Sequence, residues 1–568
     1  MTSPHASVDA AAPTPSPAHA GRKPYRVSLV FVSIFAALVL LHLPLLRLPY
    51  YWDEAGYFVP AAHDLLHTGR LIPRSTLSNA HPPLVMAYLA LGWKLFGETI
   101  VVTRLLMTLV AAATLAGVFC LARRFAGQAV AVATVASTAL YSVVFTQTTM
   151  AHLDMAAAAF TIWGLLLYLP TNARDNNDDA TNASAGATNE GDDVTNELDA
   201  ATGAPAAPRA DAATVRYTNP LMRRLSAVAL FALAALSKET AILTPLALFG
   251  WELLCLVSSR RSKTMRSLCV EPRRGALWPL LLLLSLVPLA LWLTYHYLHT
   301  GYFFGNPEFF RFNVESTVTP ARILFAGAIR LWHVTAYKNL FFLTGAAALA
   351  MFLRPLADAS VERARISIPV QLVFAVVTLA HVVALSLVGG AVLARYMLPV
   401  VPLVILVCVS TLRRRVRRWP LIVALACAAF AFALVVNPPY RYPWEENLAY
   451  RDFILLHKDA AQFLSERYPD AKVITSWPAS DELRNAHFGY TDKPLMVLTT
   501  VEHFSATELA AAAAREPQYD TVLIFSTNNK FRDLHADEAA RLLGGQLVYQ
   551  NQRRGQWIAV IRKASGEQ

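Results

Sequence analysis

Residues 27–58 read VSLVFVSIFAALVLLHLPLLRLPYYWDEAGYF, a long apolar run that ends in aromatic residues and a pair of acids. The run from 27 to 48 is long enough to cross a bilayer, which takes about 20 helical residues. Aromatic residues at 50–52 follow it, and Asp53 and Glu54 come next. The stretch therefore predicts a membrane helix that ends in a carboxylate pair, and we take this pair as the candidate reaction centre.

The composition of the whole chain indicates a polytopic membrane protein. Of its 568 residues, 55% are hydrophobic and only 16% are charged, which is too apolar for an ordinary soluble protein. The net charge of +11 would suggest a nucleic-acid partner in a soluble protein. Here most Lys and Arg residues fall in short clusters between apolar runs, which is typical of membrane orientation, so we expect no nucleic-acid partner. The five cysteines predict neither a disulfide framework nor a CxxC metal site.

Apolar runs of membrane-spanning length recur along the chain and predict a helical bundle of about 11 spans. The runs lie near 27–48, 103–122, 128–147, 154–170, 222–236, 241–257, 277–298, 333–353, 368–388, 391–411 and 419–437. The two shorter runs at 222–236 and 241–257 flank Ser237-Lys238-Glu239-Thr240, so we expect them to form a hairpin pair.

The basic residues orient these spans. Arg22, Lys23 and Arg26 precede the first run, which predicts a signal anchor with a cytoplasmic N-terminus. Alternating the loops from that start places the basic clusters on the inside, as the positive-inside rule requires. The acidic pair, the other candidate polar residues and the C-terminus then lie outside. We expect a multi-pass protein of a cell membrane, the bacterial inner membrane, with an extracytoplasmic C-terminal domain.

The chain divides by composition into a membrane domain with flexible segments and a soluble domain. Residues 1–26 are predicted to be disordered, and so is a polar, cytoplasmic insert at 171–219 whose Asn182-Ala183-Ser184 sequon is read as a chance match. The membrane domain covers 27–437 and includes an outer loop, 49–102, with two interfacial helices. Residues 438–568 alternate β-like and helical stretches, which predicts a small α/β domain for support or acceptor recognition.

The acidic pair and several other polar residues could carry chemistry, and each of them also has a structural explanation. Asp53 and Glu54 could merely complement a helix dipole. His81 precedes two prolines that aim it at the same interface, yet a lone histidine is more often structural. Asp154, two residues after His152, lies at the edge of an apolar run, where an acid is costly, but it could also cap a helix.

Two basic residues complete the candidate set. Lys238 could pair with Glu239 and only cap the helical hairpin. Arg395, followed by Tyr396, lies just inside an apolar run on the outer side and needs an anion. A lipid phosphate would supply one, because guanidinium binds phosphate in a bidentate manner.

Taken together, Asp53-Glu54, His81-Pro82-Pro83-Leu84, Asp154, Ser237-Lys238-Glu239 and Arg395-Tyr396 resemble the GT-C superfamily of membrane glycosyltransferases. The likeness is closest to the protein O-mannosyltransferase and lipid A aminoarabinose transferase branch, and it covers residues 27 to about 437. It implies a mainly α, GT-C type bundle that transfers a sugar from an undecaprenyl- or dolichyl-phosphate type donor. Transfer would occur with inversion, on the extracytoplasmic face, to a protein, lipid or glycan acceptor.

The resemblance also implies roles for individual residues. Asp53 would be the base or acceptor-orienting carboxylate, with Glu54 and Asp154 shaping the same pocket. Lys238 and Arg395 would hold the lipid phosphate. His81, His152 and Tyr396 complete the implied substrate-binding set.

One departure from the family pattern leaves the donor sugar and any metal open. The aminoarabinose-type enzymes carry Glu-Lys before the two prolines, whereas this chain has Ala80-His81, as in the mannosyltransferases. A divalent ion bridging Asp53, Asp154 or His81 stays an alternative to a site without a cofactor. A transporter or flippase of lipid-linked sugars is the second functional hypothesis, although the chain has no obvious internal repeat.

Overall fold

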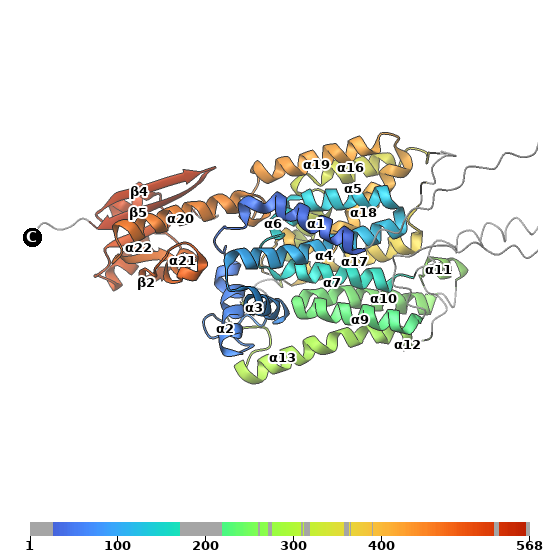
Figure 1. Ribbon diagram of the computed structural model, residues 1–568, viewed down its shortest axis with the longest axis horizontal. Helices are drawn as coiled ribbons and strands as arrows, with labels where there is room; N and C mark the ends of the chain where they lie inside the picture. Colours follow the sequence, from blue (N-terminus) through green and yellow to red (C-terminus); the bar gives the residue numbers. More distant parts are fainter. Residues whose placement is uncertain are drawn as a thin grey trace, which may run out of the picture.

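The computed structural model shows an elongated molecule, with a helical bundle and a small sheet domain at one of its ends (Figure 1). The structure describes residues 27–170, 219–258, 262–270, 275, 277–307, 310–311, 318–356, 363, 365–388, 390–526 and 533–563. The segment 1–26 and nearly all of the insert predicted at 171–219, with its sequon, lie outside these residues.

The bundle consists of helices that follow the predicted apolar runs over most of their length. Its main helices are α1 (Val27–His42), α4 (Ile100–Ala126), α5 (Gln128–Leu140), α6 (Ser142–Gln147), α7 (Leu153–Tyr168), α9 (Pro220–Ser237), α10 (Leu243–Ser258), α13 (Val287–Thr300), α15 (Pro320–Thr335), α16 (Phe341–Ala350), α17 (Ile368–Leu387), α18 (Val401–Arg415) and α19 (Trp419–Val435). A short helix, α11 (Lys263–Leu268), follows α10, and α12 (Leu277–Leu280) and η5 (Leu281–Leu286) lead into α13.

Among the described residues, six helical segments are long and apolar enough to cross a membrane. They are Val27–Leu45, Ile100–Ala126, Pro220–Ser237, Glu239–Ser258, Leu277–Thr300 and Ile368–Leu387. The other five predicted runs lie on helices of fewer than 18 residues. The predicted mainly α bundle with many apolar helices is therefore confirmed, although fewer segments reach spanning length than the sequence predicts.

Turns inside apolar runs account for part of this difference. The run at 128–147 is divided between α5 and α6 at Tyr141, and the run at 333–353 is interrupted around Lys338, whose φ is +47°. The run at 391–411 becomes α-helical only at Val401, after a 3-10 turn, η8 (Ala394–Met397). These turns are themselves built of apolar residues, so hydropathy does not mark them.

The expectation that the cysteines form no disulfide is wrong. Cys255, at the end of α10, is bonded to Cys269, which follows α11. The two residues are 14 positions apart, and α11 lies between them. The bond thus closes a short loop at the end of the bundle away from the sheet domain (Figure 1).

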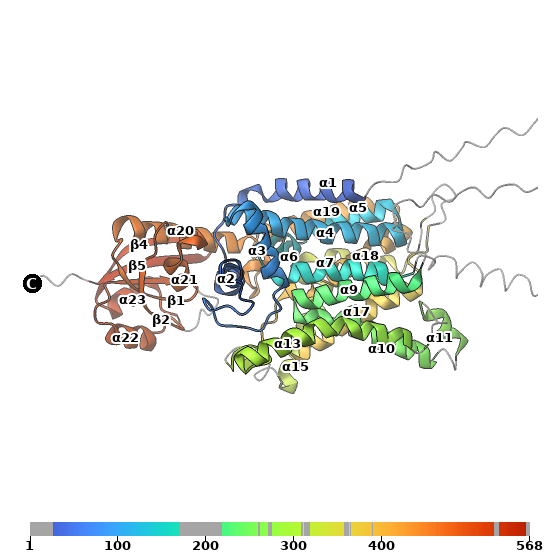
Figure 2. The same ribbon diagram turned by 60° about the horizontal axis from the view of Figure 1, so that its bottom comes forward.

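The loop between α1 and α4 is helical, as the apolar faces of its sequence predict. It contains a π-helical turn, η2 (Glu54–Phe58), followed directly by α2 (Val59–Thr68), and then α3 (Leu84–Phe96). Figure 2 shows α2 and α3 between the sheet domain and the bundle. The acidic pair therefore lies at the junction of the two parts.

The C-terminal part is an α/β domain, as predicted. It begins with α20 (Ala449–Arg467) and has a five-stranded sheet in the order β2-β1-β3-β5-β4. The strands are β1 (Lys472–Ser476), β2 (Met496–Val501), β3 (Thr521–Phe525), β4 (Gly545–Arg553) and β5 (Gln556–Lys563). β1 pairs in parallel with β2 and β3, and β5 pairs antiparallel with β3 and β4. The remaining helices are α21 (Ala479–Arg484), α22 (Ala506–Arg515) and α23 (Ala536–Leu542).

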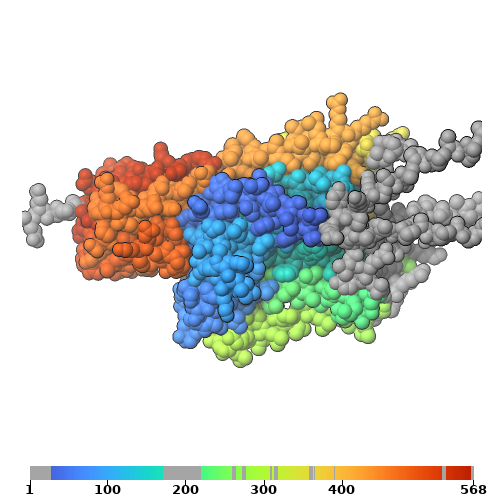
Figure 3. Space-filling model, in the orientation of Figure 1, coloured from blue at the N-terminus to red at the C-terminus, as the bar shows by residue number. Residues whose placement is uncertain are grey.

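The sheet domain shares a hydrophobic core with the loop that carries the acidic pair. Tyr51 and Phe58 of that loop belong to the same buried cluster as Tyr450, Phe453 and Phe488 of the domain. Figure 3 shows the two parts in direct contact at the surface. Because burial of apolar surface drives such packing, the domain fixes the position of the acidic loop.

Candidate active site

The backbone just before Asp53 has an unusual conformation that the sheet domain supports. Trp52 has φ +43°, a region that non-glycine residues rarely adopt. Its ring centroid lies 4.8 Å from that of Trp477 and 5.9 Å from that of Phe453, both in the C-terminal domain. The Tyr50 N–H also donates to the carbonyl of Phe488 at 3.1 Å. Through these contacts the C-terminal domain packs against the acidic loop and holds its backbone in place.

Glu54, the second acid of the pair, is fully buried, and both of its carboxylate oxygens accept hydrogen bonds. Its Oε2 accepts from the Tyr51 N–H at 2.9 Å and from Arg104 Nη2 at 3.0 Å. Its Oε1 accepts from the Ala151 N–H at 2.6 Å and pairs with Arg104 Nη1. Both oxygens are thus saturated. These bonds join the acidic loop to α4 and to the segment before α7.

Arg104 is the α4 residue that makes these bonds with Glu54. Only 2% of its surface is exposed, and besides Glu54 it donates to three backbone carbonyls, those of Leu48, Pro49 and Thr149. Acceptors around both terminal nitrogens compensate for the burial of this guanidinium. The ends of α1 and of the segment before α7 are consequently tied to α4.

Asp53 points instead to Arg395, which lies at the centre of the site. Arg395 forms an ion pair with Asp53 and lies near two further acids, with Nη1 3.1 Å from Glu445 Oε1 and Nε 3.7 Å from Asp154 Oδ2. The Asp53 side chain is 21% exposed, against 5% for Asp154 and 7% for Glu445. Asp53 is the most accessible carboxylate around this arginine.

A second cation, Lys238, joins the network through Asp154. Lys238 Nζ donates to Asp154 Oδ1 at 2.6 Å, and it lies 3.8 Å from the centroid of the Tyr396 ring. Arg330 approaches the same ring at 5.2 Å. Lys238 therefore does not pair with Glu239, and Asp154 is not a simple helix cap, because His152 occupies the N-cap of α7.

His81 lies at the edge of the network and contacts Glu239. His81 Nδ1 is 2.9 Å from Glu239 Oε2. Ala80, just before it, has φ +60°, and its carbonyl accepts from Trp292 Nε1 at 2.9 Å. These contacts fix the histidine in a cleft, whose lining includes Tyr57, Phe58, Leu77, Asn79, His81 and Trp292.

His152 is buried beside Arg395. Its Nδ1 lies 2.9 Å from Arg395 Nη1 and 2.8 Å from Gln147 Oε1. Burial lowers the pKa of His152 well below its usual value, and the charges of Arg395 and Lys238 lower it further. The imidazole is therefore neutral at physiological pH, and it contacts Arg395 without adding positive charge to the site.

A second acidic pair, which was not among the residues predicted from the sequence, reaches the same arginine. Glu445 and Glu446 follow Trp444, in the 3-10 turn η9 (Trp444–Glu446) after α19. Burial raises the pKa of Glu445 to about 8, although Arg395 opposes the shift. Glu446 is fully buried, pairs with the hydroxyl of Tyr337 and accepts from the Ala394 N–H at 2.7 Å.

A signal for this second pair is present in the sequence. Trp444-Glu445-Glu446 follows the last apolar run just as Trp52-Asp53-Glu54 follows the first one. The likeness of the two tripeptides, at the two ends of the membrane domain, could have identified Glu445 as a candidate.

Each of the three suggested metal ligands contacts a charged or titratable side chain of the protein. Asp53 pairs with Arg395, Asp154 pairs with Lys238, and His81 contacts Glu239. Within the part of the chain that the structure describes, these three side chains form no cluster of ligand atoms close enough for one ion. The carboxylates of Asp53 and Asp154 already form ion pairs with Arg395 and Lys238.

The apolar helical bundle, the charged site at its end and the sheet domain beside that site define a helical membrane protein with a C-terminal α/β domain. A family model described as dolichyl-phosphate-mannose-protein mannosyltransferase matches residues 80–180, which include His81, His152 and Asp154. No curated protein matches the chain in sequence.

Solved structures of one enzyme share this fold over nearly the whole chain. ArnT from Cupriavidus metallidurans bound to undecaprenyl phosphate is 15% identical, with a TM-score of 0.53, and the match covers 94% of this chain and 97% of that one. The apo state of the same enzyme gives 15% identity, a TM-score of 0.51 and coverage of 94% and 98%. The GT-C type fold predicted from the sequence is confirmed, and the chain is a multi-pass membrane protein.

Proposed function

We propose that the protein is an integral membrane glycosyltransferase that moves a sugar, a hexose or a pentose, from a polyprenyl-phosphate donor to an acceptor. The observation that carries this proposal is the position of Arg395, which contacts the accessible carboxylate Asp53 inside a GT-C type fold. The undecaprenyl phosphate in the ArnT structure and the dolichyl-phosphate-mannose of the family description support a lipid-phosphate donor.

Asp53 is suited to act on the acceptor hydroxyl. The hydroxyl oxygen attacks the anomeric carbon of the donor, the bond from that carbon to the phosphate oxygen breaks, and the configuration is inverted. The hydroxyl proton passes to Asp53, and the polyprenyl phosphate leaves with the bonding electrons. A phosphate is a good leaving group that needs no strong acid, so the base and the cations are the groups required.

Arg395 and Lys238 are suited to hold the donor phosphate. Each is now neutralised by a carboxylate, so the phosphate must compete with Asp53 or Asp154 for the cation. Glu445 affects this competition, because its raised pKa keeps it largely neutral at pH 7. A neutral Glu445 leaves Arg395 free for one more anionic partner, and the donor phosphodiester supplies it.

We further propose that these two cations, and not a divalent ion, neutralise the phosphate. A metal ion at Asp53, Asp154 or His81 would have to displace the contacts that these residues make with Arg395, Lys238 and Glu239. Loss of those contacts would remove a carboxylate partner from each of two buried cations, which is costly.

The proposed topology follows from the charge distribution of the sequence. The N-terminus is cytoplasmic, and the site and the C-terminal domain face the extracytoplasmic side of a bacterial inner membrane. Acceptors of three classes, a protein, a lipid or a glycan, can reach a site in this position. Glu54 acts as a positioning residue in this scheme, because its oxygens are already saturated.

The test is a transfer assay with the full chain in liposomes that contain a polyprenyl-phosphate donor with a labelled sugar. Bacterial envelope proteins, lipid A and glycans serve as acceptors in parallel. The proposal predicts covalent label on one acceptor class, with stereochemical inversion, and strong loss in Asp53→Asn. Movement of labelled donor across the bilayer without covalent transfer would overturn it in favour of a flippase.

A further inference from the structure

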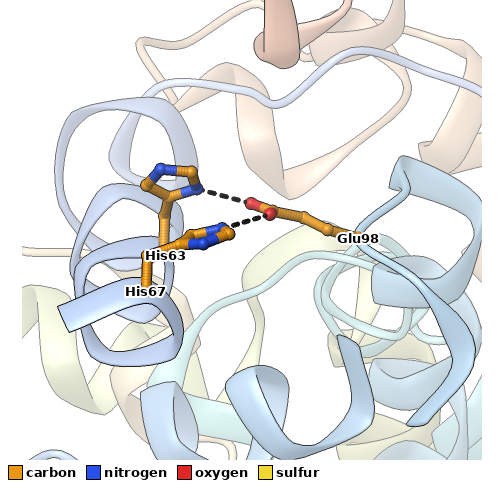
Figure 4. Close-up of side chains that lie close together, drawn as sticks. All are labelled: His63, His67 and Glu98. Atoms are coloured by element: carbon orange, nitrogen blue, oxygen red, sulfur yellow. Dashed lines mark hydrogen bonds and ion pairs between the residues drawn. The ribbon is translucent and has the colours of Figure 1, made fainter. Parts of the chain in front are cut away.

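A second polar cluster, separate from the residues around Arg395, lies between α2 and Glu98, which stands two residues before α4. His63 and His67 are one helical turn apart on α2 and both face Glu98, which precedes α4 (Figure 4). His63 Nδ1 lies 2.7 Å from Glu98 Oε1, and His67 Nε2 lies 3.0 Å from Glu98 Oε2. Residues four apart on a helix share one face, which explains why both rings reach the same carboxylate.

The three side chains form a compact set of ligand atoms. One nitrogen of each imidazole and a carboxylate oxygen all lie within 4.8 Å of one another. Within the described residues, this is the one group of three such side chains that meets that distance. A single ion at their centre would therefore need only small side-chain movements to reach bonding distance.

Neighbouring contacts hold the carboxylate in place. Glu98 stands between Gly97, whose φ is +90°, and Thr99, whose hydroxyl caps α4 by accepting from the Val102 N–H at 3.2 Å. Asp64, the acid nearest in sequence to the histidines, accepts instead from backbone N–H groups of residues 74 and 75. Glu98 is thus the acid that the local structure presents to the two rings.

We propose that His63, His67 and Glu98 bind one divalent transition-metal ion. Zinc is the metal whose preferred ligands match these three side chains best. Two imidazole nitrogens and one carboxylate form a common three-ligand zinc set, which leaves a fourth position for water. In the metal-free protein the ring nitrogens that face Glu98 donate their protons to the carboxylate. A metal ion bound at these nitrogens would take the place of those protons, and each neutral ring would then carry its proton on the other nitrogen.

The position of this site suggests what the metal does. The ion joins the C-terminal half of α2 to the start of α4, and α2 continues directly from the turn that contains Glu54. The ring of His487, from the sheet domain, stacks on His63 with centroids 5.4 Å apart. The ion thus fastens α2 where the bundle, the outer loop and the sheet domain meet.

The experiment measures metal binding by the full-length, tag-free protein in detergent, after removal of metal with EDTA. Zinc content after equilibrium dialysis against ZnCl₂, and the visible absorption of bound Co²⁺, are compared for the wild type and the double variant H63A/H67A. The expected result is one zinc per chain and tetrahedral Co²⁺ absorption in the wild type. The double variant is expected to bind at least about tenfold more weakly.

Two further variants keep the result interpretable. His503→Ala removes a histidine that also lies beside a glutamate, 3.9 Å from Glu502, but has no second ring, and it should bind zinc as the wild type does. Glu98→Gln keeps the size of the side chain and should weaken zinc binding without loss of the folded state, as judged by thermal unfolding in EDTA. Less than stoichiometric zinc in the wild type, or equal affinity in H63A/H67A, would overturn the proposal.

Discussion

Two short segments at opposite ends of the membrane domain, Trp52-Asp53-Glu54 and Trp444-Glu445-Glu446, resemble each other in sequence and in structure. In each, the second acid is fully buried and holds other parts of the fold, while the first acid contacts Arg395. The comparison shows that acids next to each other in sequence can have separate tasks. In both segments the first acid faces Arg395 and the second acid is bonded to other parts of the fold.

The two segments differ in what surrounds them. Glu54 is hydrogen-bonded to a cation, Arg104, whereas the hydrogen-bond partners of Glu446 are neutral, the Tyr337 hydroxyl and the Ala394 N–H. Lys338 acts on Glu446 only through its charge, without a hydrogen bond. Asp53 is three times as exposed as Glu445. The first segment therefore combines an ionic contact at Glu54 with an accessible carboxylate at Asp53, and the second combines neutral hydrogen bonds at Glu446 with an enclosed carboxyl group at Glu445.

The largest expected effect is on stability, from Glu54→Gln. The change leaves the charge of Arg104 buried without its counter-ion, so we expect the free energy of unfolding to fall by about 3–5 kcal/mol. Unfolding in mixed micelles measures it, with Glu466→Gln on the surface of α20 as the control. Stability equal to that of the control variant would contradict the role assigned to this ion pair.

The next effect is on transfer, from Arg395→Lys. Lysine keeps the positive charge but loses the planar fork that reaches Asp53, Glu445 and His152, so we expect transfer to fall by about 10²-fold. Initial rates at several donor concentrations measure the loss. The control is Arg451→Lys, at an exposed position. Transfer by Arg395→Lys at the rate of this control would contradict the proposal that the contacts of Arg395 with Asp53 and Glu445 matter for transfer.

Glu446→Gln should destabilise the protein less than Glu54→Gln does. The hydrogen-bond partners of Glu446 are neutral, and the amide oxygen of glutamine can still accept one of their hydrogen bonds. We therefore expect the free energy of unfolding to fall by about 1–3 kcal/mol. The same micelle titration compares the two variants directly. A loss as large as that of Glu54→Gln would show that the contacts of Glu446 are equally ionic.

The smallest effect concerns pH and Glu445. With a pKa of about 8, this acid is neutral below that pH and negative above it, where it competes with the donor phosphate for Arg395. Apparent donor affinity in the wild type should fall by about tenfold from pH 7 to pH 9, as the neutral fraction falls. Donor titrations of Glu445→Gln should be flat over this range. The same pH dependence in the variant would assign it to another group.

The sequence predicted much of this site because its polar residues recur at the same side of successive apolar runs. Asp53, Asp154, Lys238 and Arg395 were expected together, and the structure joins them in one network. Their individual chemical roles stay predictions. The strands of the C-terminal domain were also predicted, because their apolar runs are short and bounded by turns.

The rest depends on contacts between distant residues, which a local pattern does not contain. Arg104 lies within a continuous apolar run, 50 positions from Glu54, so nothing in the sequence marked the two as partners. Glu445 was overlooked because it stands where the soluble domain begins. His63, His67 and Glu98 come together only through the packing of α2 against the turn before α4.

The most direct test of the central claim is the single-turnover rate of sugar transfer by Asp53→Asn with saturating polyprenyl-phosphate donor. Asparagine keeps the shape of the side chain but cannot take the acceptor proton. We predict a rate lower by about 10²-fold or more, with the protein folded and the donor bound. A rate equal to that of the wild type would contradict the assignment of Asp53 as the base, and with it the proposed division of labour within the acidic pair.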